Sequence, residues 1–325
     1  MKYIISFILF SLSFIVVCAQ DSRWRNVDSD YGPLPSSMHI YFTDIPADTG
    51  KFRAFYLVAD LRDKKLDFTT DTTLHRRLTP SGFYSKNHNP LIVMNGTFFS
   101  FETNQNLNLV ITKGKLTSFN RQSIPGRGKD TFTYRHIFPG TFGISKKRNA
   151  DIAWVVTDSS KHFAYGIQSS FKPFKDFLTK HSISELESMT SVYSEPDKFI
   201  LTKWKMQTAI GGGPVLLQNG EIQISNNEEL KFAGKAIHDR HPRTAIGYTK
   251  DHKLILLVIE GRNPEAHGAT LAEEAQILKD LGCVEGLNLD GGGSSCLLVN
   301  GKETIKPSDK TQRAVPAVFI IQTKK

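Results

Sequence analysis

The run EGLNLDGGGSS at residues 285–295 places a carboxylate, Asp290, directly before three glycines and two serines. Asn288 and Asp290 alternate with Leu287 and Leu289, so a strand here would put the polar pair on one face and the leucines on the other. Glycine allows a ligand to approach the backbone closely and leaves main-chain N–H groups accessible to anionic oxygens. The run therefore predicts a site for an anionic ligand, although three glycines could also form only a sharp turn.

Two other stretches repeat this arrangement of an apolar run followed by glycine. IVMNGTFF at 92–99 ends its apolar run at Asn95, Gly96 and Thr97. AIGGGP at 209–214 supplies a second triple glycine, made of Gly211, Gly212 and Gly213. Asn95 also begins an N-glycosylation sequon, but the apolar residues around it predict burial instead.

A hairpin is expected over RTAIGYTKDHKLILLVIEGR, residues 243–262, with its turn at 249–252. A turn centred there would place His241 opposite Glu260 and would make Arg243 a diagonal neighbour of Glu260. Diagonal neighbours lie roughly 7–8 Å apart, within reach of long side chains. We therefore expect Arg243 and Glu260 to meet at one sheet end, where a guanidinium could bind a phosphate or carboxylate.

The segment after this hairpin predicts a β-α-β unit. TLAEEAQILKDLG, residues 270–282, carries the capping box of Thr270 and Glu273, an apolar stripe, and a glycine at its end. A helix here would join a strand at 253–260 to a parallel strand at 286–290. Both strands would then end at the same edge, where open α/β sheets bind ligands.

Most other elements are predicted to be strands. Three segments have an apolar run, a turn containing glycine and a second run, and are interpreted as hairpins. The expected fold class is α+β: a β-rich mixed sheet with several hairpins, one β-α-β crossover and few helices. The remaining predicted elements are strands at 52–61 and 90–99, hairpins at 109–119, 215–224 and 296–305, and short helices within 171–181 and 182–189.

The N-terminus has the pattern of an export signal, with Lys2, an apolar run and a small-residue cleavage site that places the cut after residue 19. Lipid attachment at Cys18 is the alternative. The rest, 20–325, is expected to be one domain with an elaboration at about 120–205. Cys283 and Cys296 are expected to be buried thiols, with a disulfide as the alternative in an exported protein.

The 325 residues carry a formal net charge of +9. The basic residues are scattered and accompany no nucleic-acid motif, so we expect an ordinary solvated surface or attraction to anionic glycans and sugar phosphates, and no nucleic-acid partner. No segment after the signal can span a membrane. His238 and His241 could hold a metal, but contact with solvent or substrate is the preferred interpretation. No cofactor is expected, although the sequence leaves open whether the protein needs a divalent cation.

The motifs NGTFF, AIGGGP, RTAIG, EGR, GATLAEEAQILKDLG, NLDGGGSS and QRAVPAVFI occur here in the order seen in the NAGPA-type phosphodiester glycosidase family. The resemblance covers roughly 85–325 and is weakest across 120–205. It departs from the family pattern at Glu260, where the family often has Asp. The resemblance implies hydrolysis of a sugar-1-phosphodiester to free sugar and a phosphomonoester.

The catalytic residues expected from the spacing and the resemblance are Asp290, Glu260 and Arg243. The side chains and loops expected to bind substrate are Asn95, Gly96, Thr97, Gly211, Gly212, Gly213, His241, Thr244, Arg262, Asn288, Gly291, Gly292, Gly293, Ser294 and Ser295. Two other functions stay open: a metal-assisted phosphodiesterase that cleaves P–O, and a non-catalytic protein that binds envelope polysaccharide. The substrate is expected outside the cytoplasm, in the periplasm or the medium, and the oligomeric state is left undetermined.

Overall fold

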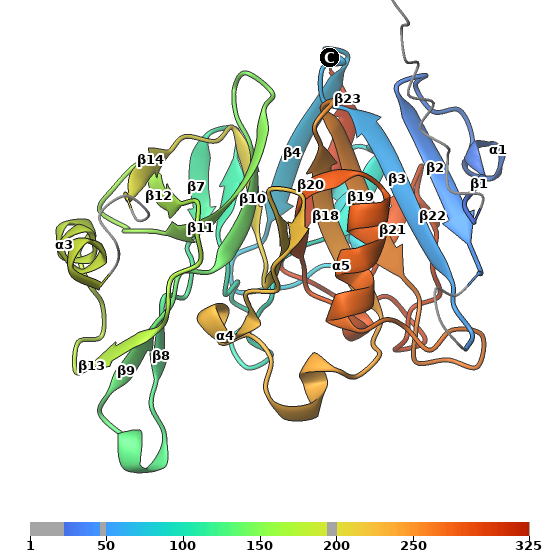
Figure 1. The fold of residues 1–325 in the computed structure, drawn as a ribbon. Helices are drawn as coiled ribbons and strands as arrows, with labels where there is room; N and C mark the ends of the chain where they lie inside the picture. Colours follow the sequence, from blue (N-terminus) through green and yellow to red (C-terminus); the bar gives the residue numbers. More distant parts are fainter. Residues whose placement is uncertain (1–22, 46–49, 194–199, 325) are drawn as a thin grey trace, which may run out of the picture.

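The computed structural model describes residues 23–45, 50–193 and 200–324 (Figure 1). The predicted signal at 1–19, with Cys18, lies outside the described residues. Strands within the described part form four sheets and the helices are few, so the α+β class predicted from the sequence is confirmed.

An eight-stranded sheet carries the segments that matter most for function. β18 lies between β19 and β20 and is antiparallel to both, so β19 and β20 run parallel to each other, and α5 connects them. The predicted β-α-β unit is thus confirmed. In spatial order the strands are β1 (Arg25–Asn26), β2 (Met38–Thr43), β3 (Ala54–Asp60), β19 (Lys253–Ile259), β18 (Arg243–Thr249), β20 (Cys283–Asn288), β16 (Val215–Gln218) and β17 (Glu221–Ile222).

The other three sheets are antiparallel wherever their strands pair. The seven-stranded sheet has the order β14 (Thr202–Trp204), β12 (Ala164–Ile167), β11 (Ala150–Val156), β10 (Gly140–Ile144), β15 (Thr208–Gly211), β6 (Val110–Thr112) and β7 (Lys115–Ser118). The five-stranded sheet has the order β22 (Lys302–Glu303), β21 (Leu297–Val299), β5 (Ile92–Asn95), β23 (Ala317–Thr323) and β4 (Leu66–Thr72). The three-stranded sheet consists of β13 (Phe174–Asp176), β9 (Tyr134–His136) and β8 (Ser123–Pro125).

The α-helices cover faces and corners of these sheets. They are α1 (Asp28–Tyr31), α2 (Pro80–Lys86), α3 (Ile183–Tyr193), α4 (Asn226–Glu229) and α5 (Leu271–Asp280). Short 3-10 turns occur at Gly128–Asp130, Gly234–Ile237 and Gly292–Ser294.

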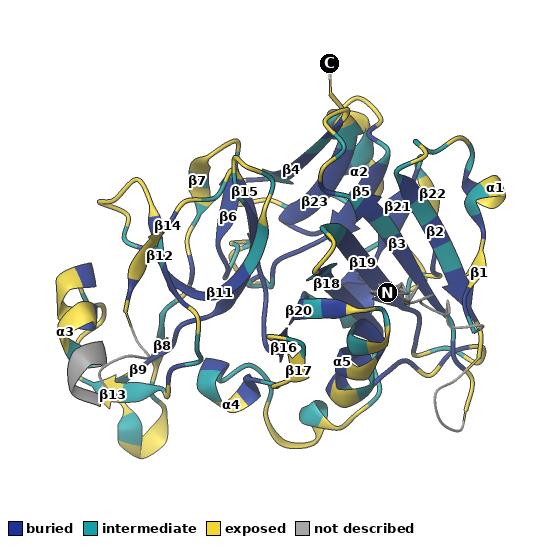
Figure 2. Ribbon diagram, turned by 45° about the horizontal axis from the view of Figure 1, so that its top comes forward, coloured by how far each residue is buried: buried dark blue, intermediate teal, exposed yellow. Residues whose placement is uncertain are grey.

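The largest core cluster joins the eight-stranded, seven-stranded and five-stranded sheets. Phe142 of β10, Ile246 of β18 and Phe319 of β23 all belong to it and are fully buried. Figure 2 shows the strands of this region in dark blue, whereas much of α3 is exposed. The region 140–167 therefore shares its core with the strands that carry the predicted site.

α5 covers the opposite face of the eight-stranded sheet. Its capping box forms as the sequence predicts, because the Thr270 hydroxyl accepts from the Glu273 N–H and the Glu273 carboxylate accepts from the Thr270 N–H. Leu271, Ala275 and Leu278 are buried against the sheet. This packing fixes the connection between the two parallel strands.

Several local predictions can be compared directly with the structure. The hairpins at 109–119, 215–224 and 296–305 appear as β6–β7, β16–β17 and β21–β22. A helix begins at Ile183, as expected for 182–189. The prediction of a helix within 171–181 is wrong, because residues 174–176 form strand β13. The hydrogen bonds that this segment forms with β9 outweigh its weak local preference for a helix.

Cys283 and Cys296 are both free and buried, as the sequence predicts. They belong to different core clusters. No helix among the described residues is long and apolar enough to cross a membrane.

Candidate functional site

Asp290 follows β20 at the edge where β19 also ends, and three backbone contacts hold it there. Its N–H donates to the carbonyl of Gly96 at 2.9 Å. Its carbonyl accepts from the Asn95 side-chain amide at 2.5 Å. The preceding N–H, of Leu289, donates to the carbonyl of Thr244 at 2.7 Å. The predicted convergence of the segments around 95, 244 and 290 is therefore present.

Asn95 has protein partners on both ends of its amide. Its oxygen accepts from the Thr244 hydroxyl and from the Cys296 N–H, both at 2.9 Å. The side chain is fully buried, so the sequon it begins is not accessible for glycosylation. Thr97 is also fully buried, and its hydroxyl donates to Asn106. The structure thus gives Asn95 a positioning role toward Asp290 rather than a free side chain for a ligand.

Burial raises the pKa of the Asp290 carboxyl to about 6, and four neighbours, among them the N–H of Gly291, oppose that shift. The Ser294 hydroxyl donates to the carboxylate, and the cations of Arg313 and Lys231 lie near enough to favour its charged form. A carboxyl with a pKa close to neutrality can exchange a proton during a reaction, which is the usual property of a general acid or base.

Lys231 is the cation that the sequence analysis missed. Its Nζ donates to the carbonyl of Gly212 at 2.8 Å and lies 3.8 Å from the centre of the Phe98 ring. Burial lowers the pKa of Lys231 to about 8, although the charges of Glu229 and Asp290 act in the opposite direction. An ammonium thus contacts the Gly211–Gly213 loop and lies near enough to Asp290 to feel its charge.

Two arginines flank the loop at 291–293. Arg313 Nη1 lies 3.4 Å from the Ser294 hydroxyl, and the same guanidinium pairs with Asp309. Arg262 packs on the loop so closely that a Cβ at Gly292 would lie 3.0 Å from its Nη1. The His241 ring nitrogen Nδ1 lies 3.1 Å from Arg262 Nη2. Burial, followed by the charges of Arg262 and Arg243, lowers the pKa of His241, so the surroundings of the loop are cationic.

The expected meeting of Arg243 with Glu260 is wrong, because the hairpin register differs by one from the expected register. Arg243 pairs directly with Ile259, so alternation places Glu260 on the opposite face of the sheet. Arg243 lies on the face that α5 covers, and its Nε donates to the carbonyl of Ala269, just before that helix, at 2.9 Å. Neither side chain has a hydrogen bond to the other or to Asp290 among the described residues.

Glu260 is held by partners of its own. Its carboxylate accepts from Asn263 Nδ2 at 3.0 Å and from the Lys306 N–H at 3.1 Å, and Arg53 Nε lies 3.5 Å away. The side chain is buried. Within the described part of the chain, Glu260 therefore has contacts that anchor loops, and the structure pairs it with none of the groups around Asp290.

Arg243 instead has Glu274 of α5 as its acidic neighbour. Burial raises the pKa of Glu274 to about 8, against the opposing charge of Arg243. Both Glu274 oxygens are buried without a hydrogen-bond partner in the described protein. The Glu274 carboxyl lies between α5 and the face of the eight-stranded sheet that carries Arg243.

Most N–H groups of the glycine loops are not free for a ligand, contrary to the expectation from the sequence. The N–H groups of Gly211, Gly212, Gly213 and Gly292 donate to main-chain carbonyls, for example Gly213 to Asn288 at 2.8 Å. Glycine is required here for close packing. A Cβ at Gly212 would overlap the Asn288 carbonyl, and one at Gly291 would lie 2.7 Å from that of Pro242.

Glu229 of α4 fixes the Gly211–Gly213 loop from behind. Its carboxylate accepts from the N–H groups of Gly140 and Val215, both at 2.9 Å, and from the Ser225 hydroxyl at 2.6 Å. Gly140 belongs to the seven-stranded sheet and Val215 to the eight-stranded sheet. Glu229 was not predicted, because nothing in the sequence around α4 shows which backbone groups its carboxylate meets.

Two buried oxygens near the loops have no hydrogen-bond partner among the described residues. They are Asn288 Oδ1 and Ser295 Oγ. Asn288 uses its other amide atom to donate to the Gly213 carbonyl at 2.7 Å. These oxygens keep the capacity to hydrogen-bond to a buried water, or to a bound sugar if the loops shift.

His238 and His241 do not form a metal-ligating cluster with acidic or cysteine side chains in the described part of the chain. His238 is exposed, and His241 contacts Arg262. Arg313 was also missed as a site residue, although it lies within the motif QRAVPAVFI that contributed to the resemblance.

Comparison with known proteins points to the same family as the sequence motifs. The family model described as phosphodiester glycosidase matches residues 88–322. The mouse N-acetylglucosamine-1-phosphodiester alpha-N-acetylglucosaminidase is 32% identical over 105 residues, which cover 30% of this chain and 20% of the mouse protein. Matched segments cover only 12% to 26% of the curated relatives' lengths.

Two solved structures share the fold. The zebrafish N-acetylglucosamine-1-phosphodiester alpha-N-acetylglucosaminidase catalytic domain, auto-inhibited by its pro-peptide, superposes with a TM-score of 0.58 at 21% identity, covering 88% of this chain and 83% of that one. A hypothetical protein from Synechocystis superposes with a TM-score of 0.64 at 13% identity, covering 93% and 64%. Since the family model spans well over half of the sequence, the chain belongs to the phosphodiester glycosidase family.

Proposed function

We propose that this protein hydrolyses the glycosidic bond of a sugar-1-phosphodiester, releasing the sugar and a phosphomonoester. Family membership supports a hydrolase of this general kind. The observation that carries the proposal is the arrangement at Asp290: a carboxyl with a pKa raised to about 6, next to a glycine loop and near the cations of Lys231 and Arg313.

The Asp290 carboxylate acts as the base for the water molecule that attacks the anomeric carbon. The reaction breaks the bond between that carbon and the phosphate oxygen, and the electron pair leaves with the phosphomonoester. Water provides the new anomeric hydroxyl, and its proton is taken up at the Asp290 carboxylate. Because the leaving group is already a stabilised anion, it requires charge stabilisation more than protonation.

The side-chain cations provide that stabilisation. Arg313 and Arg262 flank the loop at 291–293, and Lys231 contacts Gly212 of the other glycine loop and acts electrostatically on Asp290, whereas most loop N–H groups are already bonded within the protein. Asn288 Oδ1 and Ser295 Oγ are buried without a hydrogen-bond partner among the described residues, so they would meet a sugar hydroxyl only if the loops shift when substrate binds. Glu260 and Arg243 hold the framework on either face of the sheet, through contacts to Lys306 and Ala269.

Hydrolysis in oxygen-18 water tests which bond breaks. UDP-sugars and synthetic sugar-phosphate diesters serve as substrates, with and without a chelator. We expect an unlabelled phosphomonoester, because water adds to the sugar carbon. Label in the phosphate would show P–O cleavage and would overturn the proposal.

Asp290→Asn tests the assignment of the carboxylate. The amide cannot accept the proton, so we expect turnover to fall by at least about 1,000-fold while the protein stays folded. Asp44→Asn, an exposed acid elsewhere on the molecule, is the matched control. Turnover by Asp290→Asn at the control rate would rule out this role, and a protein that only binds glycans would retain its affinity in both variants.

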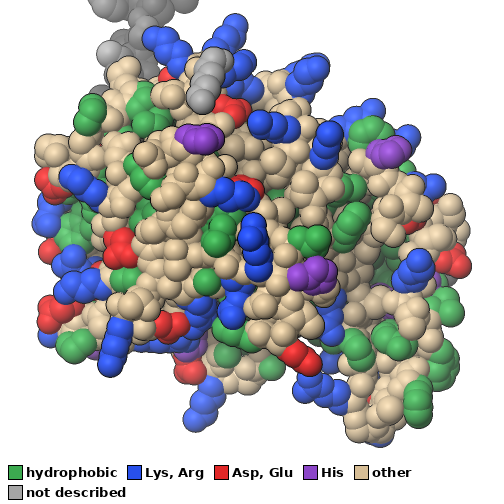
Figure 3. Space-filling model, turned by 180° about the vertical axis from the view of Figure 1, so that it is seen from behind, with side chains coloured by type: hydrophobic (Ala, Val, Ile, Leu, Met, Phe, Trp, Pro, Cys, Tyr) green, Lys and Arg blue, Asp and Glu red, His purple; other side chains and the backbone are tan. Residues whose placement is uncertain are grey.

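The site of action is proposed to be outside the cytoplasm, in the periplasm or the medium, on an envelope glycan or another sugar phosphate. The pattern at 1–19 supports export, with lipid attachment at Cys18 as the alternative product. Lys and Arg side chains are spread among acidic ones on the face in Figure 3, which does not suggest a nucleic-acid surface. Mass spectrometry of the exported protein tests this: a mature chain beginning at Gln20 is expected, and an uncleaved cytoplasmic chain would contradict it.

A further inference from the structure

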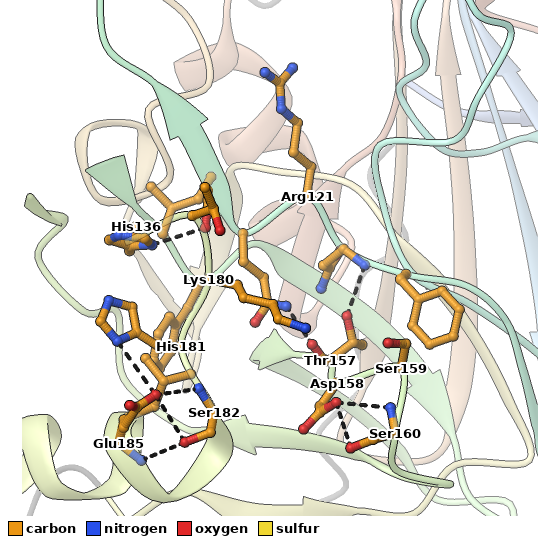
Figure 4. A pocket seen from close by; sticks show the side chains of 18 residues that line it. Arg121, His136, Thr157, Asp158, Ser159, Ser160, Lys180, His181, Ser182 and Glu185 are labelled. Carbon is orange, nitrogen blue, oxygen red and sulfur yellow. Dashed lines mark hydrogen bonds and ion pairs between the residues drawn. The ribbon is translucent and has the colours of Figure 1, made fainter. Parts of the chain in front are cut away.

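A cavity of about 680 Å³ lies away from the glycine loops (Figure 4). Its wall is formed by segments at 119–123, 136–138, 157–160 and 179–186. Figure 1 places β8, β9, β13 and α3 together at one end of the molecule, at a distance from β18 and β20. Nothing in the proposed glycosidase reaction uses this cavity.

Two histidines of this cavity wall, His136 and His181, meet the carboxylate of Asp176, and all three side chains bind metals well. His136 ends β9, Asp176 ends β13, and His181 lies just before α3. His136 Nε2 is 3.0 Å from Asp176 Oδ1, and His181 Nε2 is 2.7 Å from Asp176 Oδ2. One ligand atom from each residue can be chosen so that all lie within 4.8 Å of one another.

The two imidazoles are shielded from bulk water. The exposed fraction of the side chain is 4% for His136 and 1% for His181, against 28% for Asp176. The His136 ring stacks on Phe174, with the ring centres 4.8 Å apart. The rings are therefore held in fixed orientations, and the ligand atoms are already assembled.

The far nitrogen of each ring faces an oxygen, as is usual for histidines that ligate metals. His136 Nδ1 lies 2.9 Å from the Ser123 hydroxyl. His181 Nδ1 lies 3.8 Å from Glu185 Oε2, is buried, and has no hydrogen bond to the described protein. Protons on the Nδ1 atoms would leave two Nε2 lone pairs pointing at the Asp176 carboxylate, an arrangement that a cation between them would stabilise.

From this geometry we propose that His136, Asp176 and His181 bind one divalent transition-metal ion, with Zn²⁺ the best match. Two imidazole nitrogens and a carboxylate oxygen are typical Zn²⁺ ligands, whereas Ca²⁺ and Mg²⁺ prefer oxygen alone. Ligand atoms of a tetrahedral site with bonds of about 2.0–2.1 Å lie roughly 3.3 Å apart. Small adjustments of the observed positions reach that spacing, and a fourth coordination position remains for water or a ligand in the cavity.

The competing arrangement is a hydrogen-bonded chain in which both Nε2–H groups donate to Asp176. The two arrangements differ in one measurable respect, since only the first binds a metal. The bound ion would also tie the three-stranded sheet to the start of α3, so metal should raise the melting temperature.

The experiment uses the full exported chain after treatment with a chelator and dialysis. Zn²⁺ is titrated in competition with a chromophoric chelator, and Co²⁺ is added to a second sample for visible spectroscopy. We expect one equivalent of Zn²⁺ bound with a Kd at or below about 1 µM, a Co²⁺ spectrum typical of tetrahedral nitrogen and oxygen ligands, and a higher melting temperature with metal. Failure of the chelated wild-type protein to bind Zn²⁺ at this level would overturn the proposal.

Variants locate the ion. His181→Ala should weaken Zn²⁺ binding by at least about 100-fold and abolish the melting-temperature shift. His162→Ala, an exposed histidine of the same region, is the matched control and should bind as the wild type does. Equal affinities of these two variants would place the metal elsewhere.

Should His181→Ala not fold, Ser123→Ala decides the question. Among the described residues, the hydroxyl that is lost has one hydrogen bond, to the far nitrogen of His136, so we expect binding to weaken about 10-fold or more. Wild-type affinity in Ser123→Ala would then count against the site. Glycosidase activity is measured in parallel but does not enter the decision, so the proposed function and this site can fail separately.

Discussion

The side-chain amide of Asn95 donates to the main-chain carbonyl of Asp290 at 2.5 Å, across a sequence separation of 195 residues. The same amide accepts from Thr244 and from the N–H of Cys296. One buried side chain thus connects the ends of three strands and sets the position of the proposed catalytic residue.

Asn95→Ala should reduce kcat strongly with a smaller effect on KM, because Asp290 loses its anchor while the surrounding cations remain. Three buried partners are also left unpaired, so we expect the free energy of unfolding to fall by about 2–4 kcal/mol. Steady-state kinetics and urea denaturation measure the two effects. Thr244→Val removes only one of these hydrogen bonds and should show a smaller loss of both, and an unchanged kcat in Asn95→Ala would contradict the positioning role.

The pH dependence of kcat/KM should be bell-shaped. Activity should rise through a pKa near 6 as Asp290 loses its proton and fall through a pKa near 8 as Lys231 loses its own. In Lys231→Met the alkaline limb should disappear. The acid limb should also move to higher pH, because the cation that favoured the Asp290 carboxylate is gone. An acid limb that stays in place would show that Lys231 does not act on Asp290.

Glu229→Gln should destabilise the fold more than its position on a four-residue helix suggests. The carboxylate accepts three hydrogen bonds, and the amide nitrogen of glutamine cannot replace an acceptor. We expect a loss of about 2–4 kcal/mol in urea denaturation. The neighbouring Glu228→Gln is the matched control, with an expected change below about 0.5 kcal/mol.

Glu274 should make stability depend on pH. Burial raises its pKa in the folded protein to about 8, above the ordinary value of 4.5, so the folded state holds the proton more tightly than the unfolded state. The contribution of protonated Glu274 to the free energy of unfolding is fully present below about pH 4.5 and is lost as pH rises through about 8.

In Glu274→Gln this contribution is absent. Between pH 4.5 and 8 the wild type should lose stability relative to the variant by an amount on the order of 5 kcal/mol, measured by urea denaturation at several pH values. Parallel stability curves for the two proteins would contradict a protonated Glu274.

Local signals in the sequence predicted the fold class well. The capping box of α5 and the three glycine-turn hairpins depend on residues close together in the chain, and all of them are present in the structure. The strand at β13 was mistaken for a helix because its pairing with β9 is a long-range contact that periodicity does not reveal.

The site was predicted in outline, and its details were not. The convergence of Asn95 and Asp290 follows from strand ends at a shared edge. Arg243 and Glu260 were assigned to one face because an error of one residue in the register reverses every side chain. Lys231 and Arg313 come from loops whose positions depend on the packing of the glycines, which no spacing in the sequence encodes.

The last strand of the chain, β23, lies between β4 and β5 and pairs with both. Asn95 ends β5, so the segment that anchors Asp290 is completed on one side by residues 317–323. A chain made from its N-terminus onward therefore carries every proposed catalytic group before it has the strand that aligns them. A chain that stopped before residue 317 would carry Asp290, Lys231 and Arg313 but would lack the strand that pairs with β5, so we expect it to lose the proposed activity.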